Sequence, residues 1–324
     1  MSDVQRVPFD IGSLDLCSGG GWPIGRSTLL YGKPRTGKTT TALYILRAYQ
    51  QADNRMAVIY DEEDKWSSER AEQIGIDMSR VQVEPPGFCI EDLDAILMLV
   101  RERKDVGFCL VDSLREMPVE QRLEESKKRD PSIGDVYVGA EATVLNQFYD
   151  HLPRYQRRRR DAGSPFSFVG INHESVSIQT IGGRQIQSIV IPGGRVQRYG
   201  SYLRVRFHTS EYAKEMTVNG ISFAPKLQVK FTVEANSGKV ASGKFWLFQA
   251  GPRTGEVDQE GQFLTWGQAS GFIGGGGTNW VVGERNGFRN HQAITDDWLS
   301  NREQYTKDRR EITRLMLDVI KNES

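Results

Sequence analysis

The sequence predicts an α/β fold, in which a mostly parallel sheet is covered by helices on both faces and ends in antiparallel strands. Apolar strand-like segments alternate with amphipathic helical segments, which is typical of a parallel sheet. A glycine-rich stretch follows one early strand and leads into a helix. Two later strands end in acidic residues, and a ligand of such a fold lies at the carboxyl ends of the strands.

The order of the expected elements follows from this alternation. Strands are expected at Ser27–Tyr31, Met56–Asp61, Gly107–Asp112, Phe166–Asn172, Tyr202–His208, Leu227–Val233 and Phe245–Phe248. Helices are expected at Thr40–Gln51, Ser67–Ile74, Glu91–Arg103 and Ala140–Tyr155. From about Phe263 the composition changes, with a glycine run and a final helix that carries one apolar stripe. We therefore predict a core at 1–262 and a small C-terminal helical module at 263–324.

The composition fits a globular protein with a hydrophobic core. Of the 324 residues, 38% are hydrophobic and 26% are charged. The formal net charge is zero, so nucleic-acid binding would need a local basic surface. Three scattered cysteines do not suggest a disulfide framework or a zinc site. No apolar run approaches the roughly 20 residues of a membrane span, and the N-terminus lacks a signal-peptide core. We expect a cytoplasmic protein.

The stretch GKPRTGKT matches the phosphate-binding pattern G-x-x-x-x-G-K-[ST] at every fixed position. In such a loop the backbone N–H groups surround phosphate oxygens. Lys38 would supply charge to the β- and γ-phosphates, and the Thr39 hydroxyl would hold Mg²⁺. A glycine-rich turn that matches by chance is the alternative. The predicted nucleotide-binding residues are Gly32, Lys33, Pro34, Arg35, Thr36, Gly37, Lys38, Thr39 and Thr40.

Acidic residues at two strand ends suggest the rest of a phosphate-transfer site. Asp112 follows four apolar residues, as a Walker B acid does, and would help hold Mg²⁺; a buried aspartate that caps the next helix is the alternative. Hydrolysis also needs a base that orients the attacking water. Glu62 and Glu63 are the candidates, and only one is expected to face the nucleotide because strand side chains alternate. His173, just past another strand, could sense the γ-phosphate, although such a histidine is more often a turn residue.

Two long segments, 118–139 and 174–200, interrupt the alternation. Loops of this length are usually functional or disordered. Their arginines and lysines suit a phosphate backbone, and their apolar side chains could wedge between bases. The alternative is a solvated charged surface, and the run Arg157–Arg160 after a predicted helix has the same two interpretations. The candidate DNA-contacting residues are Lys127, Lys128, Arg129, Val138, Ile178, Arg184, Arg195 and Arg198.

Several stretches, in order, resemble the RecA recombinases, over about Phe9 to Ile320. LDLCSGGGWPIGRSTLLYGKPRTGKTTTAL resembles their nucleotide-binding core, VIYDEED the strand with the catalytic glutamate, and CLVDSL the Walker B strand. IGDVYVG resembles the end of the first DNA-binding loop. VGINHE and PGGRVQRYGSYLRVRF resemble the entry to and the exit from the second. ITDDWLSNREQYTKDRREITRLMLDVI resembles the C-terminal helical module.

The resemblance implies roles for single residues. It implies that Lys38, Thr39 and Asp112 bind MgATP. It places the catalytic base at Glu63 by the spacing from the strand, whereas counting forward from the phosphate loop gives Glu62.

The resemblance also bears on how ATP and DNA are linked. His173 falls where bacterial RecA has a glutamine that senses the γ-phosphate, and a histidine there is similar to phage recombinases of the UvsX type. Val138 and Ile178 fall where the loops of the family insert apolar side chains between base triplets. The lysines that act across the subunit interface in bacterial RecA map to about Val233 and Ala235, neither of which is basic.

As a whole, the resemblance implies a DNA-dependent ATPase, hydrolysing ATP to ADP and phosphate, that forms helical filaments on single-stranded DNA and promotes pairing and strand exchange with homologous duplex DNA. It implies further copies of the chain, single-strand-binding proteins and mediator proteins as partners, no membrane, and the cytoplasm of a bacterial host if a phage encodes the chain. The alternatives are a ring-forming motor or helicase with the RecA fold, and an annealing protein with weak ATPase activity.

Overall fold

The computed structural model describes residues 4–118, 140–181, 184–192, 196–235 and 240–323. The chain divides into two compact units, which comprise 1–9, 17–211 and 229–243, and 10–16, 212–228 and 244–324, respectively. The boundary expected after residue 262 does not coincide with this division. It falls inside the continuous helix α8 (Gln259–Ala269), so a module cannot begin at residue 263 without cutting a helix.

A mostly parallel sheet is the centre of the first unit, as the sequence predicts. Its strands lie in the order β11-β14-β10-β3-β7-β6-β4-β5, and β15 pairs with β14. The strand β10 pairs in parallel with β3 and antiparallel with β14, which confirms antiparallel pairing toward one edge. The bounds are β3 (Ser27–Gly32), β4 (Met56–Asp61), β5 (Val81–Glu84), β6 (Val106–Asp112), β7 (Ser167–His173), β10 (Leu203–Phe207), β11 (Glu211–Tyr212), β14 (Lys226–Ala235) and β15 (Val240–Phe248).

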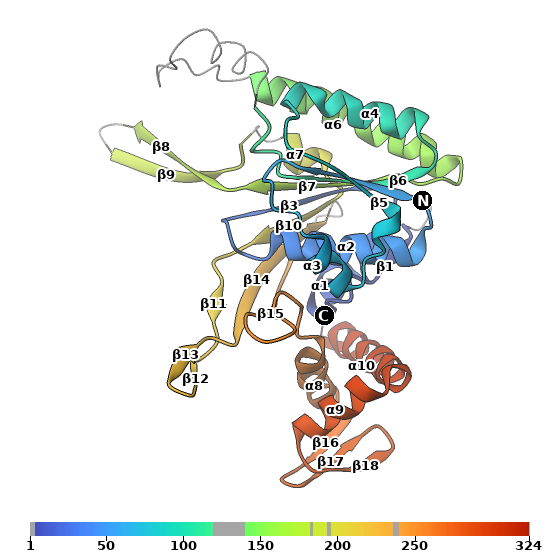
Figure 1. Cartoon of the computed structure of the whole chain (residues 1–324), viewed down its shortest axis with the longest axis vertical. Coiled ribbons are helices and arrows are strands. Elements are labelled where there is room, and N and C mark those ends of the chain that lie inside the picture. The colour runs from blue at the N-terminus through green and yellow to red at the C-terminus, as the bar shows by residue number, and fades with distance from the viewer. Residues whose placement is uncertain (1–3, 119–139, 182–183, 193–195, 236–239, 324) are drawn as a thin grey trace. The chain divides into compact units, whose positions relative to one another are not determined.

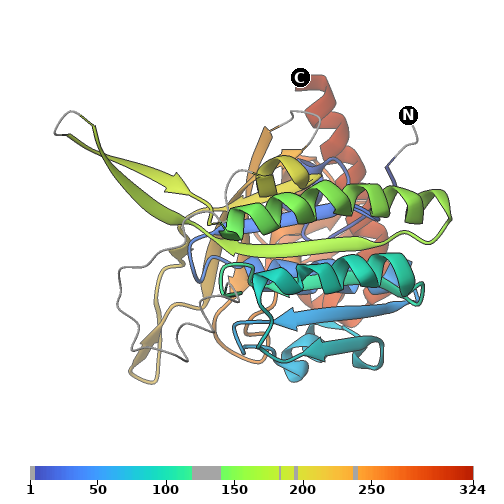
Figure 2. The same cartoon turned by 90° about the horizontal axis from the view of Figure 1, so that it is seen from above.

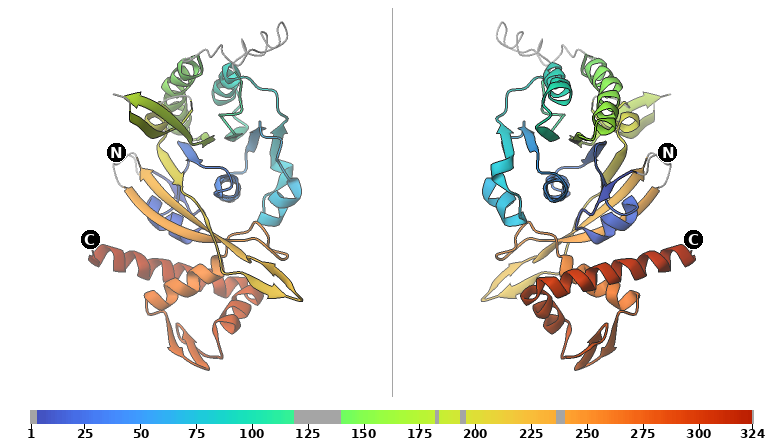
Figure 3. Two further views of the ribbon diagram at one scale, coloured as in Figure 1. Left: turned by 90° about the vertical axis from the view of Figure 1, so that its left-hand side faces the viewer. Right: turned by 90° about the vertical axis from the view of Figure 1, so that its right-hand side faces the viewer.

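Helices cover both faces of this sheet (Figure 1). On one face lie α2 (Lys38–Ala52) and α3 (Ser68–Ile74). On the other lie α4 (Leu93–Glu102), α6 (Ala140–Asp161) and the short α7 (Val196–Gly200). The helices α4 and α6 run side by side, as both views of Figure 3 show. The shorter segments are α1 (Gly12–Ser18), η1 (Met78–Arg80), η2 (Ile90–Asp92) and the paired strands β1 (Arg6–Val7) and β2 (Trp22–Pro23).

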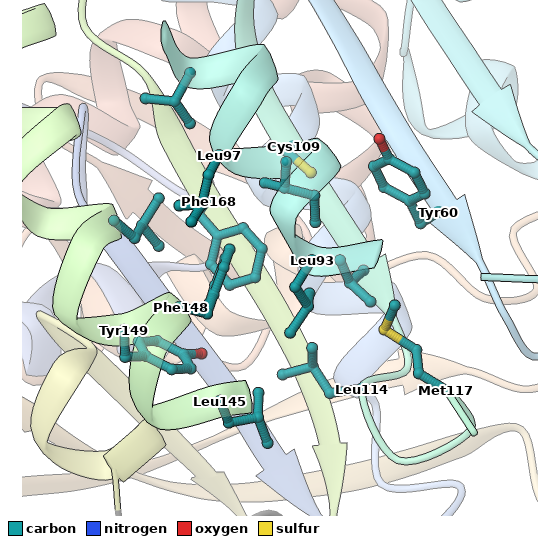
Figure 4. Packing of buried hydrophobic residues seen from close by; sticks show 14 of the residues in the cluster. Tyr60, Leu93, Leu97, Cys109, Leu114, Met117, Leu145, Phe148, Tyr149 and Phe168 are labelled. Atoms are coloured by element: carbon teal, nitrogen blue, oxygen red, sulfur yellow. The ribbon is translucent and has the colours of Figure 1, made fainter. Parts of the chain in front are cut away.

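A hydrophobic core packs between the sheet and the pair α4 and α6 (Figure 4). On α4 the buried residues Leu93, Leu97 and Val100 follow helical spacing, which fixes the face that the helix buries. Phe148 of α6 meets Phe168 of β7 edge to face, with ring centroids 5.1 Å apart. Complete burial of each such side chain contributes about 1.5–3 kcal/mol to stability. This packing holds the parallel strands in register.

The segment 174–200 is not the open loop that the sequence suggests. Residues Ser175–Ile181 (β8) and Arg184–Val190 (β9) form an antiparallel hairpin, which extends from the sheet beyond the carboxyl end of β7 (Figure 2). Both segments alternate polar and apolar residues, as strands do. Residues 119–139 of the other predicted loop lie outside the described residues.

The helix α6 is longer than predicted and includes the arginine run. It continues past Pro153 to Asp161, so Arg157–Arg160 lie within the helix rather than after it. Arg159 is buried, and its guanidinium donates to the backbone carbonyls of Val100 and Val106, both at 2.9 Å. This arginine therefore fastens α6 to the chain between α4 and β6, and it is not on a solvated face.

The second unit contains a small sheet in addition to helices. Its bounds are β16 (Ile273–Gly276), β17 (Asn279–Val282), β18 (Arg285–Phe288), α9 (His291–Ser300) and α10 (Arg302–Glu323), together with the hairpin β12 (Met216–Val218) and β13 (Ile221–Phe223). Trp298 is fully buried at the centre, and its indole N–H donates to Asp308 at 2.7 Å. The predicted C-terminal helices are present, and the glycine run between them pairs as β16, where a Cβ at Gly275 would meet a backbone oxygen at 2.3 Å.

Among the described helices, none is both long enough and apolar enough to cross a membrane.

Candidate active site

Four neighbouring strands bring their last residues to one edge of the sheet. Gly32, His173, Asp112 and Asp61 end β3, β7, β6 and β4, which are adjacent in that order. Gly32 is paired with His173, and Asp61 is paired with Asp112. The predicted convergence of these residues is therefore present in the structure.

The backbone geometry of the loop GKPRTGKT explains why both of its fixed glycine positions require glycine. Gly32 has φ of 150°, and a Cβ there would lie 2.3 Å from the carbonyl oxygen of Phe207. Gly37 has φ of 93°, in the left-handed region, directly before α2. Thr36 closes the loop by donating its hydroxyl to the carbonyl of Lys33 at 2.8 Å. The backbone thus wraps tightly, and the side chains of Lys33, Pro34 and Arg35 are exposed.

Lys38 is a buried cation held beneath the loop. Its Nζ donates to the carbonyl oxygens of Gly32 at 3.2 Å and Lys33 at 2.8 Å. The same atom lies 3.5 Å from Nδ1 of His173. Burial lowers the pKa of the Lys38 ammonium to about 8. The charge is poorly hydrated, so an anion at the loop would be attracted strongly.

Thr39 and Asp112 present oxygen atoms beside the loop. The Thr39 hydroxyl donates to Oδ2 of Asp112 at 2.8 Å. The other carboxylate oxygen, Oδ1, is buried and has no hydrogen-bond partner among the described residues. Burial, together with the nearby carboxylates of Glu63 and Asp61, raises the pKa of Asp112 to about 6. An oxygen-lined position that already repels negative charge suits Mg²⁺, which prefers oxygen ligands.

Glu63 faces this site through His173. Its Oε1 lies 2.7 Å from Nε2 of His173, and its Oε2 accepts from Nζ of Lys65 at 2.5 Å. The tautomer with a proton on Nε2 satisfies both histidine contacts, because Nδ1 can then accept from Lys38. Burial alone would raise the pKa of Glu63, but the hydrogen bonds from Lys65 and His173 outweigh it and lower the pKa. Glu63 is therefore held as a carboxylate.

Glu62 points elsewhere. Its carboxylate accepts the backbone N–H groups of Gly87 at 3.1 Å and Phe88 at 3.4 Å, in the chain before α4. Burial raises the pKa of Glu62, in contrast to that of Glu63. Of the two alternatives that the sequence leaves open, the structure brings Glu63 and not Glu62 to His173.

Three residues of the site have contacts that the sequence reading missed. Asp61 is not free at the strand end, because its Oδ2 accepts the backbone N–H groups of Lys65 and Trp66 and closes the turn. Thr40, a predicted nucleotide-binding residue, is buried, and its hydroxyl accepts a hydrogen bond from Arg70 of α3. An acid four or five residues before the amides it binds is a turn signal, whereas nothing local indicates the Arg70 contact.

The predicted DNA-contacting residues are only partly described. Lys127, Lys128, Arg129, Val138 and Arg195 lie outside the described residues. Ile178 and Arg184 are described as backbone of β8 and β9, where Ile178 pairs with Gln187. Arg198 is half-exposed and forms an ion pair with Glu234 at 3.1 Å. Val233, one of the positions to which the resemblance maps the lysines that act across the subunit interface, is buried in β14.

The parallel sheet and the strand–loop–helix around GKPRTGKT define an α/β protein with the phosphate-loop arrangement. The family model described as the RecA N-terminal domain matches residues 1–231, and the chain belongs to the RecA family.

Relatives named Protein RecA are similar to much of the chain. That of Mycoplasma pneumoniae is 27% identical over 229 residues, which is 70% of this chain and 63% of the relative. That of Desulfotalea psychrophila is 32% identical over 136 residues, or 42% of this chain and 36% of the relative. That of Lactobacillus delbrueckii subsp. bulgaricus is 26% identical over 257 residues, or 79% and 72%. The first two matches thus span less than two thirds of the relatives.

Proposed function

We propose that this chain is a DNA-dependent ATPase that forms filaments on single-stranded DNA and promotes homologous pairing and strand exchange. The observation that carries the proposal is a continuous set of contacts from the phosphate loop to the hairpin. Lys38 contacts His173, His173 contacts Glu63, and His173 is the last residue before the segment that enters β8. A side chain that touches both the loop cation and a carboxylate can report what is bound at the loop.

The next residue keeps this connection rigid. The backbone N–H of Glu174 donates to the carbonyl of Gly32 at 3.2 Å, and its carboxylate accepts from Arg206 of β10 at 2.6 Å. A displacement of His173 would therefore also displace the residues that follow it. We expect it to reach the hairpin, where Ile178, Arg184 and, farther on, Arg195 and Arg198 are the proposed DNA contacts.

The proposed chemistry assigns one task to each residue. Lys38 binds the β- and γ-phosphates of ATP, and Thr39 with Asp112 holds Mg²⁺, which would supply charge neutralisation to the phosphates. Glu63 accepts a hydrogen bond from the attacking water and orients it, which its lowered pKa permits at neutral pH. Glu62 is outside this set because its carboxylate is occupied by backbone amides.

One position, that of His173, distinguishes a phage-type recombinase from a bacterial RecA in this proposal. The likeness to the UvsX type depends on His173, and a phage origin with action in the cytoplasm of a bacterial host belongs to this proposal. Assembly into a filament with ATP between protomers, and loading by single-strand-binding and mediator proteins, belong to it as well.

The test is ATP turnover with and without single-stranded DNA, in the wild type, Glu63→Gln and the matched neighbour Glu62→Gln, with negative-stain images of each mixture. We expect DNA to stimulate the wild type, Glu63→Gln to lose about 10²–10⁴-fold in turnover, and Glu62→Gln to retain most of it. Helical filaments should appear on DNA. Turnover that ignores DNA, together with closed rings, would favour the motor or helicase. Pairing of strands with negligible wild-type turnover would favour the annealing protein.

A further inference from the structure

A basic cavity lies at the opposite end of the sheet from the phosphate loop. It has a volume of about 750 Å³, and Arg26, Arg157, Arg160, Asp161, Pro165 and Tyr202 are among its lining residues. Arg26 directly precedes β3, and Tyr202 directly precedes β10. Because β3 has six residues and an extended strand rises about 3.3 Å per residue, roughly 20 Å of strand separates this cavity from Gly32. A ligand here is not the nucleotide of the phosphate loop.

Arg26 is a guanidinium without hydrogen-bond acceptors in the described part of the chain. Its Nε is buried and unpartnered, and its planar group lies over the ring of Tyr202, with 5.0 Å from Cζ to the ring centroid. The stacking fixes the orientation of the guanidinium while its terminal amino groups remain without acceptors. Such a preorganised fork matches two oxygens of a phosphate.

The other cations of the cavity lack strong counter-charges. Arg160 donates to the carbonyl of Gly25 at 2.5 Å, which is a neutral acceptor. Burial lowers the pKa of Arg160, and the charge of Arg26 lowers it further, so the two cations repel one another. Arg157 and Asp161 form a loose pair at 3.8 Å, with both side chains more than two thirds exposed. Three arginines and one aspartate leave an excess of two positive charges.

A second cavity adjoins the first through two shared residues. It has a volume of about 370 Å³, and both cavities are lined by Arg26 and Tyr202. Tyr199, Tyr149 and Asp150 also line it; Tyr199 is largely exposed, whereas Tyr149 is buried in the core. Aromatic rings beside arginines accept the flat face of a base and the phosphate next to it. The pair of cavities has room for more than a single inorganic ion.

We propose that these two cavities form a binding site for a phosphate ester, with Arg26, Arg157 and Arg160 on the phosphate and the tyrosines beside the group that carries it. Across the two cavities the three arginines, Asp161 and Asp150 leave an excess of one positive charge, which matches a phosphodiester, and a phosphomonoester presents the same oxygens with a second charge. The source is either a free nucleotide or the backbone of a DNA strand. The site is separate from the proposed DNA contacts Ile178 and Arg184 of the hairpin, which follows the carboxyl end of β7.

The experiment is calorimetric titration of the full chain with AMP and, separately, with a twelve-residue oligothymidylate. Both titrations use a Lys38→Ala background, so that the phosphate loop contributes little. Arg26→Ala removes the preorganised fork, and Arg157→Glu reverses a charge at a largely exposed position where folding should be unaffected. Arg103→Ala, an exposed arginine paired with Asp105, is the matched control. Near-ultraviolet circular dichroism of each variant checks the fold.

We expect Arg26→Ala and Arg157→Glu each to weaken binding of at least one ligand by about tenfold or more, because a charge-assisted hydrogen bond or an ion contact is lost. Arg103→Ala should change it less than twofold. Loss for AMP alone identifies a free nucleotide as the ligand, and loss for the oligonucleotide alone identifies the DNA backbone. Affinities for both ligands that are unchanged in folded Arg157→Glu, or no measurable binding of either ligand, would overturn the site. The proposed ATPase would be unaffected by that result.

Discussion

Positively charged side chains lie at both ends of the central sheet, buried at Lys38 and Arg159 and half-buried at Arg26, and their hydrogen-bond partners differ. At the carboxyl end, Lys38 contacts two carbonyl oxygens and a histidine, all from the loop and the neighbouring strand end. At the amino end, Arg159 is matched to backbone carbonyls, whereas Arg26 has no hydrogen-bond acceptor among the described residues. The comparison teaches that residue type and burial do not define a role. The partners of each donor separate a structural cation from one that can meet a ligand.

The largest effect is expected at Arg159. Arg159→Ala should lower the free energy of unfolding by about 3 kcal/mol or more, because several carbonyls at the end of α4 and in β6 lose their donor inside the protein. Urea unfolding monitored by circular dichroism measures it. Arg158→Ala, one residue earlier and exposed, is the control and should stay within about 0.5 kcal/mol of the wild type. Equal losses of stability in the two variants would contradict the view that the hydrogen-bond partners of an arginine determine its structural role.

The next largest effect on stability is expected at Asp112. The pKa of this acid is raised in the folded protein, so its ionisation lowers the free energy of unfolding. Burial raises the pKa of Asp112 to about 6, from 3.8 for an ordinary aspartate. The folded state therefore holds the proton more tightly, so this contribution to stability is present below about pH 3.8 and is lost as the pH rises through about 6. At pH 8 the ionised group costs up to about 3 kcal/mol.

Asp112→Asn should therefore stabilise the ligand-free protein at pH 8 and have little effect at pH 4. Urea unfolding at the two pH values, in the presence of a metal chelator, measures the difference. Asp94→Asn on the exposed face of α4 is the control and should change the free energy of unfolding by less than about 0.5 kcal/mol. A lower free energy of unfolding for Asp112→Asn than for the wild type at pH 8 would contradict this account. It would mean that the ionised carboxylate of Asp112 is stabilised in the folded protein.

A smaller effect is expected from the titration of Lys38. Burial lowers the pKa of its ammonium to about 8, so above that pH the free protein loses the charge that meets phosphate. Affinity for ADP should fall about tenfold between pH 7 and pH 9. Lys38→Arg should flatten the profile, because a guanidinium stays charged over this range. A flat wild-type profile, measured by calorimetry, would show that the charge of Lys38 does not contribute to binding.

The sequence predicts the carboxyl end of the sheet better than the rest because the signals there are local. The strands that end at Asp61 and Asp112 are continuous apolar runs, and the loop from Gly32 to Thr39 has fixed residue types. Buried parallel strands must bring such ends together, so the site follows from the pattern. The hairpin β8–β9 could not be predicted with the same certainty, because glycine pairs, which are typical of loops, stand beside its alternating residues.

The alternation of side chains along a strand could not decide between Glu62 and Glu63. Both residues follow the end of β4, where the chain turns and the N–H of Glu63 donates to the carbonyl of Asp112 at 3.2 Å. Alternation of side chains holds only inside a strand, so the direction of each carboxylate depends on contacts with distant segments. The role of Arg159 could not be predicted for the same reason, because its acceptors in α4, in β6 and between them lie more than 50 positions away in the chain.

The central claim is that His173 connects the phosphate loop to DNA binding. The most direct measurement is the ratio of ATP turnover with and without single-stranded DNA in the wild type, in His173→Ala and in the control His151→Ala on the exposed part of α6. We predict that DNA stimulates the wild type and the control to the same extent, and that the ratio falls to near one in His173→Ala. A ratio in His173→Ala equal to that of the wild type would contradict the account.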